Sequence, residues 1–207
     1  MQERDLAYHY ITPVNIIMVI VNVIVFFALD FLGDTSDGLF MFEHGAMYPD
    51  AVLLDGEWYR LLTSAFLHFD ISHLVNNMIM LICLGSYLER ALGSVKYVVF
   101  YAATAVGSSL ISMKYMLYSG DIAVSGGASG VIFAVIGALL YLVIRNKGHF
   151  EDLTMMRFLI MIALSLYYGF TTTGVDNAAH VGGLCIGFVL GILLYRREIH
   201  RQRLRRS

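Results

Sequence analysis

Hydrophobic residues fall in six long runs that are separated by shorter polar segments. An α-helix needs about 20 residues to cross the hydrocarbon core of a membrane, and each run reaches that length or comes close to it. The pattern predicts six transmembrane helices, at residues 13–31, 71–88, 96–118, 128–144, 155–170 and 178–195. We therefore expect an all-α integral membrane protein, built as one six-helix bundle.

The polar segments divide the chain without indicating a second domain, so residues 1–207 are expected to form a single membrane domain. Residues 1–12 precede the first run, residues 196–207 form a basic tail, and about 32–70 form a long loop. This first loop holds the only tryptophan, several tyrosines and many acids, a mixture typical of the membrane interface. The mixed charges before the first run, with no clear cleavage site after it, favour a retained helix over a signal peptide.

The composition supports a membrane location. Hydrophobic residues make up 58% of the chain and charged residues only 14%, against about 25% in soluble domains. A soluble enzyme and a disordered chain are both disfavoured, because so much apolar surface would not stay hydrated. Cys83 and Cys185 lie inside apolar runs, which predicts buried thiols rather than a disulfide framework.

Lysine and arginine are distributed unevenly between the two predicted faces. With a cytoplasmic amino terminus, the inner side holds Arg4, Arg90, Lys96, Arg145, Lys147, Arg157, Arg196, Arg197, Arg201, Arg203, Arg205 and Arg206. The outer side keeps only Arg60 and Lys114. The positive-inside rule therefore predicts that both termini are cytoplasmic, and we expect the plasma (inner) membrane of a bacterium. The arginine tail suits anionic lipid head groups rather than nucleic acid.

Four polar residues are predicted to share one layer near the outer face. His73, Ser129 and His180 each lie sixteen residues before a charged residue at the inner end of their helix, which corresponds to about 24 Å. In a core about 30 Å thick this level is submerged, and Asn77 lies roughly 6 Å deeper. Such residues could serve only as hydrogen-bonding contacts between helices, but polar groups at this depth also mark functional sites.

Ser129 follows the glycine-rich segment 125–130 and opens the fourth run, which is too short to cross the membrane alone. Irregular backbone at this depth must line protein or a wet cavity, and free N–H groups at a helix start can stabilise an oxyanion. The Gly-x-Ser-Gly pattern is weak by itself. However, small residues recur every fourth position in the fourth and sixth runs: Gly126, Gly130, Ala134 and Ala138, then Ala179, Gly183, Gly187 and Gly191. A tight crossing of the two helices would bring the Ser129 hydroxyl and the His180 imidazole within hydrogen-bond reach, as in a base-activated nucleophile.

At these residues the chain resembles the rhomboid intramembrane serine proteases over nearly its whole length. The motifs are Trp58-Tyr59-Arg60, His68, His73-x-x-x-Asn77, Gly127-Ala128-Ser129-Gly130 and Ala179-His180-Val181-Gly182-Gly183.

The resemblance implies a six-helix bundle with Ser129 as nucleophile and His180 as base, a dyad without a carboxylate. It also implies that His73, Asn77 and the Ser129 backbone N–H bind the oxyanion, and that Arg60 and Glu89 have structural roles. Phe133 stands where many relatives have a tyrosine that stacks on the base, so the ring is kept and its hydroxyl is lost.

The predicted function is that of a serine endopeptidase that cleaves single-span membrane proteins near the outer face of the bilayer through an acyl-enzyme. The expected partners are transmembrane substrates and the lipid bilayer, with no nucleic acid, and the sequence does not indicate an oligomeric state. We expect no cofactor and no metal, because His-Glu-x-x-His is absent.

Three other hypotheses stay open at this point. The chain could be a non-catalytic membrane chaperone or trafficking factor, like the inactive branch of the same family, although both Ser129 and His180 are present. A transporter would also contain broken helices and buried polar groups, but no inverted repeat is evident. Asp176 could be a third triad member beside His180. Its expected position at the water-exposed mouth of the last helix argues against that role.

Overall fold

The computed structural model describes residues 12–151, 153–156, 158–160, 162–163 and 174–196. Its long helices are α2 (Pro13–Leu32), the continuous segment α6 (Ile71–Met80), η2 (Leu81–Gly85) and α7 (Ser86–Leu92), then α8 (Ser94–Ser119), α9 (Ser129–Arg145) and α11 (Asn177–Leu194). The first loop contains the short helices α3 (Gly38–Glu43), α4 (Pro49–Leu53), α5 (Arg60–Thr63) and η1 (Ser64–Phe66). The sequence pattern did not predict these short helices. Two short strands, β1 (His149–Phe150) and β2 (Leu153–Thr154), form an antiparallel hairpin after α9.

Five of the six predicted spans match helices. Among the described residues, four segments are long and apolar enough to cross a membrane, and α9, with 17 residues, is the short one that the sequence predicted. The fifth predicted span, 155–170, lies largely outside the described residues. The second span is longer than predicted and contains one π-helical turn, η2, where Gly85 packs against the side chains of Asn15 and Tyr97.

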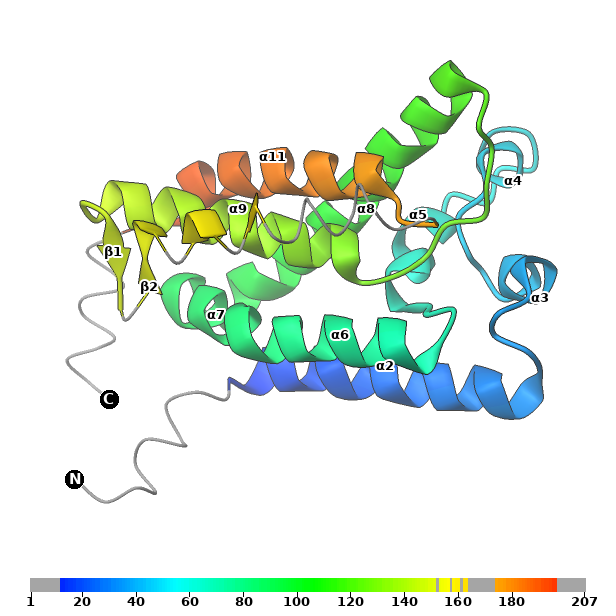
Figure 1. Cartoon of the computed structure of the whole chain (residues 1–207), viewed down its shortest axis with the longest axis horizontal. Coiled ribbons are helices and arrows are strands. Elements are labelled where there is room, and N and C mark those ends of the chain that lie inside the picture. Colours follow the sequence, from blue (N-terminus) through cyan, green and yellow to red (C-terminus); the bar gives the residue numbers. More distant parts are fainter. Residues whose placement is uncertain (1–11, 152, 157, 161, 164–173, 197–207) are drawn as a thin grey trace.

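Helix α9 occupies the centre of the bundle. It lies side by side with α11, while α8 crosses behind this pair and α2 runs along α6 and α7 (Figure 1). Every residue from 130 to 139 is buried. A helix that is apolar on all sides is expected in such a central position.

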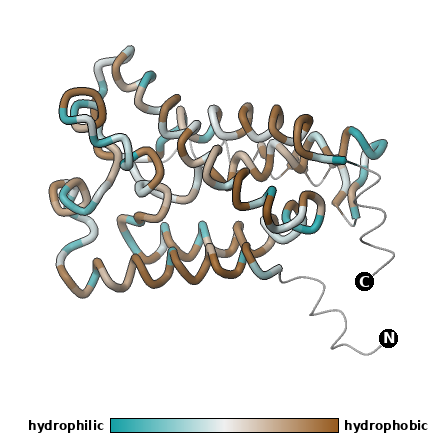
Figure 2. Tube along the Cα trace, turned by 180° about the vertical axis from the view of Figure 1, so that it is seen from behind, coloured by the Kyte–Doolittle hydropathy of each residue, from teal (hydrophilic) through white to brown (hydrophobic). Residues whose placement is uncertain are grey.

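The outer helices are largely hydrophobic along their length (Figure 2), and many of their apolar side chains are exposed. Ile24 and Phe27 of α2 and Leu193 of α11 are all more than half exposed. Such a surface suits contact with lipid rather than water. For the same reason the prediction of buried thiols was wrong: Cys83 and Cys185 are free but exposed, because an apolar run in a membrane helix can face lipid instead of protein.

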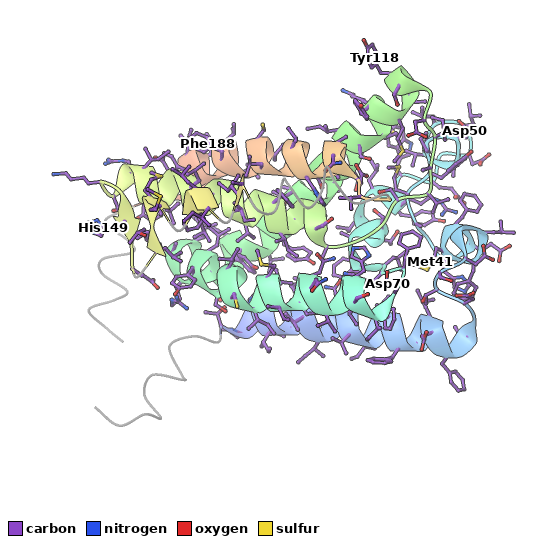
Figure 3. The ribbon with its side chains drawn as sticks, viewed as in Figure 1. Met41, Asp50, Asp70, Tyr118, His149 and Phe188 are labelled. Carbon is purple, nitrogen blue, oxygen red and sulfur yellow. The ribbon has the colours of Figure 1, made fainter. Side chains whose placement is uncertain are left out.

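The two ends of the bundle differ. Asp50, Asp70 and Tyr118 lie at the end formed by the first loop, and His149 lies at the opposite end (Figure 3). Arg60 holds the first loop together by donating to the carbonyl oxygens of Phe42 (2.5 Å) and Ala46 (2.9 Å), and it pairs with Glu57.

At the other end, Glu89 is buried and accepts hydrogen bonds from the N–H groups of Val14 (3.2 Å) and Asn15 (2.7 Å) and from the Ser94 hydroxyl (2.7 Å). It therefore caps the start of α2 with a carboxylate, whose two oxygens accept all three hydrogen bonds. The structural roles expected of Arg60 and Glu89 agree with these contacts.

Candidate functional site

The first turns of α6, α9 and α11 open toward the same end of the bundle (Figure 1). The first turns of α9 and α11 carry Ser129 and His180. The first two turns of α6 carry His73 and Asn77. Asp70 caps α6 by accepting from the His73 N–H (2.8 Å), and Asp176 caps α11 by accepting from the Ala179 N–H (2.8 Å). These caps define where α6 and α11 begin, whereas α9 begins after Ala128 without a side-chain cap.

Ser129 is the first residue of α9, so its N–H belongs to the first turn, where helical acceptors are lacking. The loop before it is irregular: Gly127 has a φ of +133°, a value that side chains rarely allow. The Gly127 N–H donates to the Ser64 carbonyl oxygen (2.8 Å), and Ser125 forms a β-bridge with Met47. The loop between α8 and α9, residues 120–128, is here called the serine loop. It is thus attached to the first loop through its backbone.

The crossing of α9 and α11 is as tight as the small-residue stripes predicted. A Cβ added to Gly183 would overlap the carbonyl oxygen of Gly130, and one added to Gly187 would overlap that of Ala134. Near the site, a Cβ on Gly130 would lie 3.8 Å from the Ala179 Cβ. Gly130 follows Ser129 and Ala179 precedes His180, so the close contact joins the two turns that carry the candidate dyad.

His180 is buried, and the Phe133 ring lies parallel to its imidazole. The ring centroids are 4.2 Å apart with an interplanar angle of 11°. Its Nδ1 has no hydrogen-bond partner among the described residues, so Asp176 does not bond to that atom as a triad carboxylate would. Asp176 is also partly buried rather than at an open mouth, which corrects the position expected from the sequence.

His73 and Asn77 lie against the serine loop. A Cβ added to Gly127 would be 2.8 Å from two atoms of the His73 ring and 3.7 Å from the Asn77 Nδ2. That amide nitrogen is buried and has no partner within the described part of the chain. Two side chains that can donate hydrogen bonds thus adjoin the backbone of Gly127, two residues before Ser129.

His68 is nearly completely buried, and its ring packs edge-on against His73 with centroids 4.9 Å apart. Burial, and secondly the neighbouring His73, lower the pKa of His68 to about 3. It is therefore neutral at ordinary pH. Both of its ring nitrogens are without a partner among the residues described, and sequence reasoning had singled it out only as part of the family motif.

A small polar cavity adjoins Ser129. Its volume is about 20 Å³, enough for about one water molecule. Its polar lining comes from Ser64, Ser108, Ser109, Ser125, Ser129 and Asp176. Water near Ser129 was expected from the glycine-rich segment, whereas no pattern in the sequence indicates that serines of α8 and Asp176 line the cavity. The part of the chain that the structure describes contains no cluster of three residues suited to hold a metal ion.

Comparison with known proteins gives the family. The Rhomboid domain model matches residues 55–197. Rhomboid protease GluP of Bacillus subtilis is 33% identical over 172 residues, which is 83% of this chain and 33% of that protein. RHOMBOID-like protein 5 of Arabidopsis thaliana is 38% identical over 145 residues, 69% of this chain and 46% of that protein.

Putative rhomboid protease YdcA of B. subtilis is 30% identical over 148 residues, 71% of this chain and 72% of that protein. The chain thus spans a third to a half of the first two relatives, and most of the third. With the family model covering residues 55–197 and four helices suited to cross a bilayer, the chain is a multi-pass integral membrane protein that belongs to the rhomboid family.

Proposed function

We propose that this chain is an intramembrane serine endopeptidase with Ser129 as its nucleophile and His180 as its general base. His180 removes the proton from the Ser129 hydroxyl as Oγ attacks a substrate carbonyl carbon. The protonated imidazole then gives that proton to the leaving amine as the peptide bond breaks. Water adds to the acyl-enzyme with His180 again as base, which releases the second product and restores Ser129.

The developing oxyanion is stabilised by the Ser129 N–H and by the side chains of Asn77 and His73. Donors that already point to the place where charge develops need no reorganisation during the reaction. The unpartnered Asn77 amide supports this role, because a buried donor without a partner is costly unless function requires it. The polar cavity beside Ser129 offers a place for the hydrolytic water.

One observation carries the proposal: the close crossing of α9 and α11 next to Ser129 and His180. Gly183 lies directly against the Gly130 carbonyl, and a Cβ on Gly130 would be 3.8 Å from the Ala179 Cβ, so the two turns pack closely together. Phe133 stacks on His180 and takes the orienting role that a carboxylate has in a triad. A non-catalytic membrane chaperone would need neither this contact nor a donor aimed at the serine loop.

The substrates that we propose are single-span membrane proteins, cut near the outer face of the bilayer. A peptide bond inside a helix is shielded, so a substrate helix must unwind before Ser129 can attack it. A small residue before the cut and a readily unwound helix fit that requirement. We further propose that one membrane domain comprises the whole chain, with both termini in the cytoplasm of a bacterium.

The dyad can be tested on the full chain purified in detergent. Incubation with a serine-directed fluorophosphonate, followed by mass mapping, should locate one adduct on Ser129. Ser129→Ala and His180→Ala should both abolish the adduct and the cleavage of a single-span substrate, while Ser36→Ala, an exposed serine of the first loop, should preserve both. Intact cleavage by Ser129→Ala would overturn the proposal, and a folded wild type that neither labels nor cleaves would favour the chaperone alternative.

The orientation needs a separate test. Reporter fusions after residue 120, in the loop before α9, and after residue 147, beyond α9, should report opposite sides of the membrane. An external position for the second fusion would reverse the proposed topology.

A further inference from the structure

The carboxylate of Asp176 joins three separate parts of the chain. Its Oδ1 accepts from the Ala179 N–H at the start of α11 (2.8 Å). Its Oδ2 accepts from the Ser125 hydroxyl in the serine loop (2.7 Å) and also from the Ser112 hydroxyl of α8. The Asp176 side chain therefore links the loop that leads to Ser129 with α11, the helix that carries His180. It also fastens both of them to α8.

We propose that Asp176 is a positioning residue that sets the placement of the Ser129 loop relative to His180. The proposal rests on the proposed protease function and assigns Asp176 no contact with the reacting atoms. It differs from a triad role, because the His180 Nδ1 makes no hydrogen bond with Asp176 or any other described residue.

The contacts on the serine side show why the link matters. Ser125 lies four residues before Ser129, and its backbone already pairs with Met47, with N···O distances of 2.8 and 2.9 Å in the two directions. This pairing attaches the loop to the first loop but not to α11. The hydrogen bond from the Ser125 hydroxyl to Asp176 is the polar contact that attaches it to the helix of His180.

The contacts on the histidine side are equally direct. Asp176 is the N-cap of α11, and its carbonyl oxygen accepts from the His180 N–H (3.1 Å). A shift of Asp176 would therefore move the first turn of α11 and the imidazole with it. Ser112 is fully enclosed in α8, so it offers a fixed point against which both parts are held.

The chemistry requires an acid at this position rather than any good cap. Serine and asparagine cap helices about as well as aspartate. Only a carboxylate has two acceptor oxygens, so that one can cap the helix while the other accepts from two hydroxyls. Charge-assisted hydrogen bonds of this kind are also stronger than neutral ones.

The experiment separates capping from positioning in the full chain purified in detergent. Asp176→Ser keeps a cap but removes the second oxygen, Asp176→Ala removes both, and Ser112→Ala with Ser125→Ala removes the donors while leaving the carboxylate. Asp37→Ala is the matched control, because Asp37 caps α3 by accepting from the Leu39 N–H (2.9 Å) outside the site. The measurements are the rate of fluorophosphonate labelling at Ser129, kcat and KM for a single-span substrate, and the unfolding temperature.

We expect Asp176→Ser to unfold near the wild-type temperature yet to label and turn over about 10- to 100-fold more slowly, with KM within twofold, because small misplacements reduce rates steeply. The double serine variant should show the same loss, and adding Asp176→Ser to it should cause little further loss. Asp37→Ala should label at the wild-type rate.

If Ser129 in the Asp176→Ser variant is labelled at the wild-type rate, the proposal is overturned and Asp176 is a helix cap only. Fully additive losses in the combined variant would also overturn it, because they would mean that Asp176 and the serines act separately. In both cases the wild type still labels at Ser129, which distinguishes these results from a failure of the protease proposal, in which the wild type does not label at all.

Discussion

The ring of Phe133 lies parallel to the imidazole of His180, with centroids 4.2 Å apart and an angle of 11° between the planes. Phe133 lies one turn after Ser129 on α9, whereas His180 belongs to α11. The helix of the nucleophile thus also supplies the surface against which the base rests. Movement between the two helices would disturb both the distance and the orientation of the dyad.

Phe133→Ala is expected to lower kcat by about 2- to 13-fold, because aromatic pairs contribute about 0.5–1.5 kcal/mol beyond their buried area. Phe133→Tyr should retain the rate, since the ring is kept. The control is Phe188→Ala: Phe188 pairs with Tyr141 across the same two helices, with centroids 5.8 Å apart, and neither ring contacts the dyad. An equal loss of kcat in both alanine variants would show that the stack on His180 has no special role.

Gly183→Ala should reduce both stability and labelling at Ser129. The new methyl group would overlap the Gly130 carbonyl and force α11 away from α9, and overpacking of this kind costs about 1–3 kcal/mol. Gly38→Ala is the comparison, because open space surrounds the corresponding Cβ and the backbone needs no positive φ. Thermal unfolding in detergent and the labelling rate check the effect, and unchanged values for Gly183→Ala would argue against a tight crossing.

Asn77→Ala is expected to lower kcat by roughly 10²- to 10³-fold with a small change in KM, as for the loss of one oxyanion donor. Asn22→Ala controls for the loss of a buried amide, because Asn22 lies in α2 and donates to the Met18 carbonyl oxygen (2.7 Å). Steady-state kcat and KM for a single-span substrate are measured for both variants, and only Asn77→Ala should show the large loss of kcat. A larger effect on KM than on kcat in Asn77→Ala would assign the amide to substrate binding instead.

Glu89→Ala should destabilise the protein without slowing the chemistry of the folded molecules. It removes the acceptor for two N–H groups at the start of α2 and for the Ser94 hydroxyl, and each buried group left unpaired costs about 1–3 kcal/mol. The exposed Glu43 provides the control variant Glu43→Ala. We expect a lower unfolding temperature for Glu89→Ala but a normal labelling rate at low temperature; a slow rate there would mean that this end of the bundle communicates with the site.

Much of the fold was predictable because lipid imposes a simple rule on the sequence. Backbone groups must be satisfied within helices, so apolar runs of about 20 residues identify the spans to within a few residues. The small-residue stripes also predicted the α9–α11 crossing correctly, since small residues let two helix backbones approach closely. The short helices of the first loop escaped prediction because they have neither the length nor the periodicity that a pattern needs.

The amino-acid sequence by itself determined that this chain crosses the membrane repeatedly, and it predicts that Ser129, His180 and His73 share one level with Asn77 about one turn deeper. Both results follow from helix geometry, in which position along the chain converts directly into depth. Only the tertiary structure decided that Gly127 adjoins His73 and that Asp176 binds Ser112 and Ser125, whereas the stack of Phe133 on His180 is what the family resemblance implied. These contacts depend on how separate helices rotate and cap against one another, and spacing along a single helix carries no information about its neighbours' rotation.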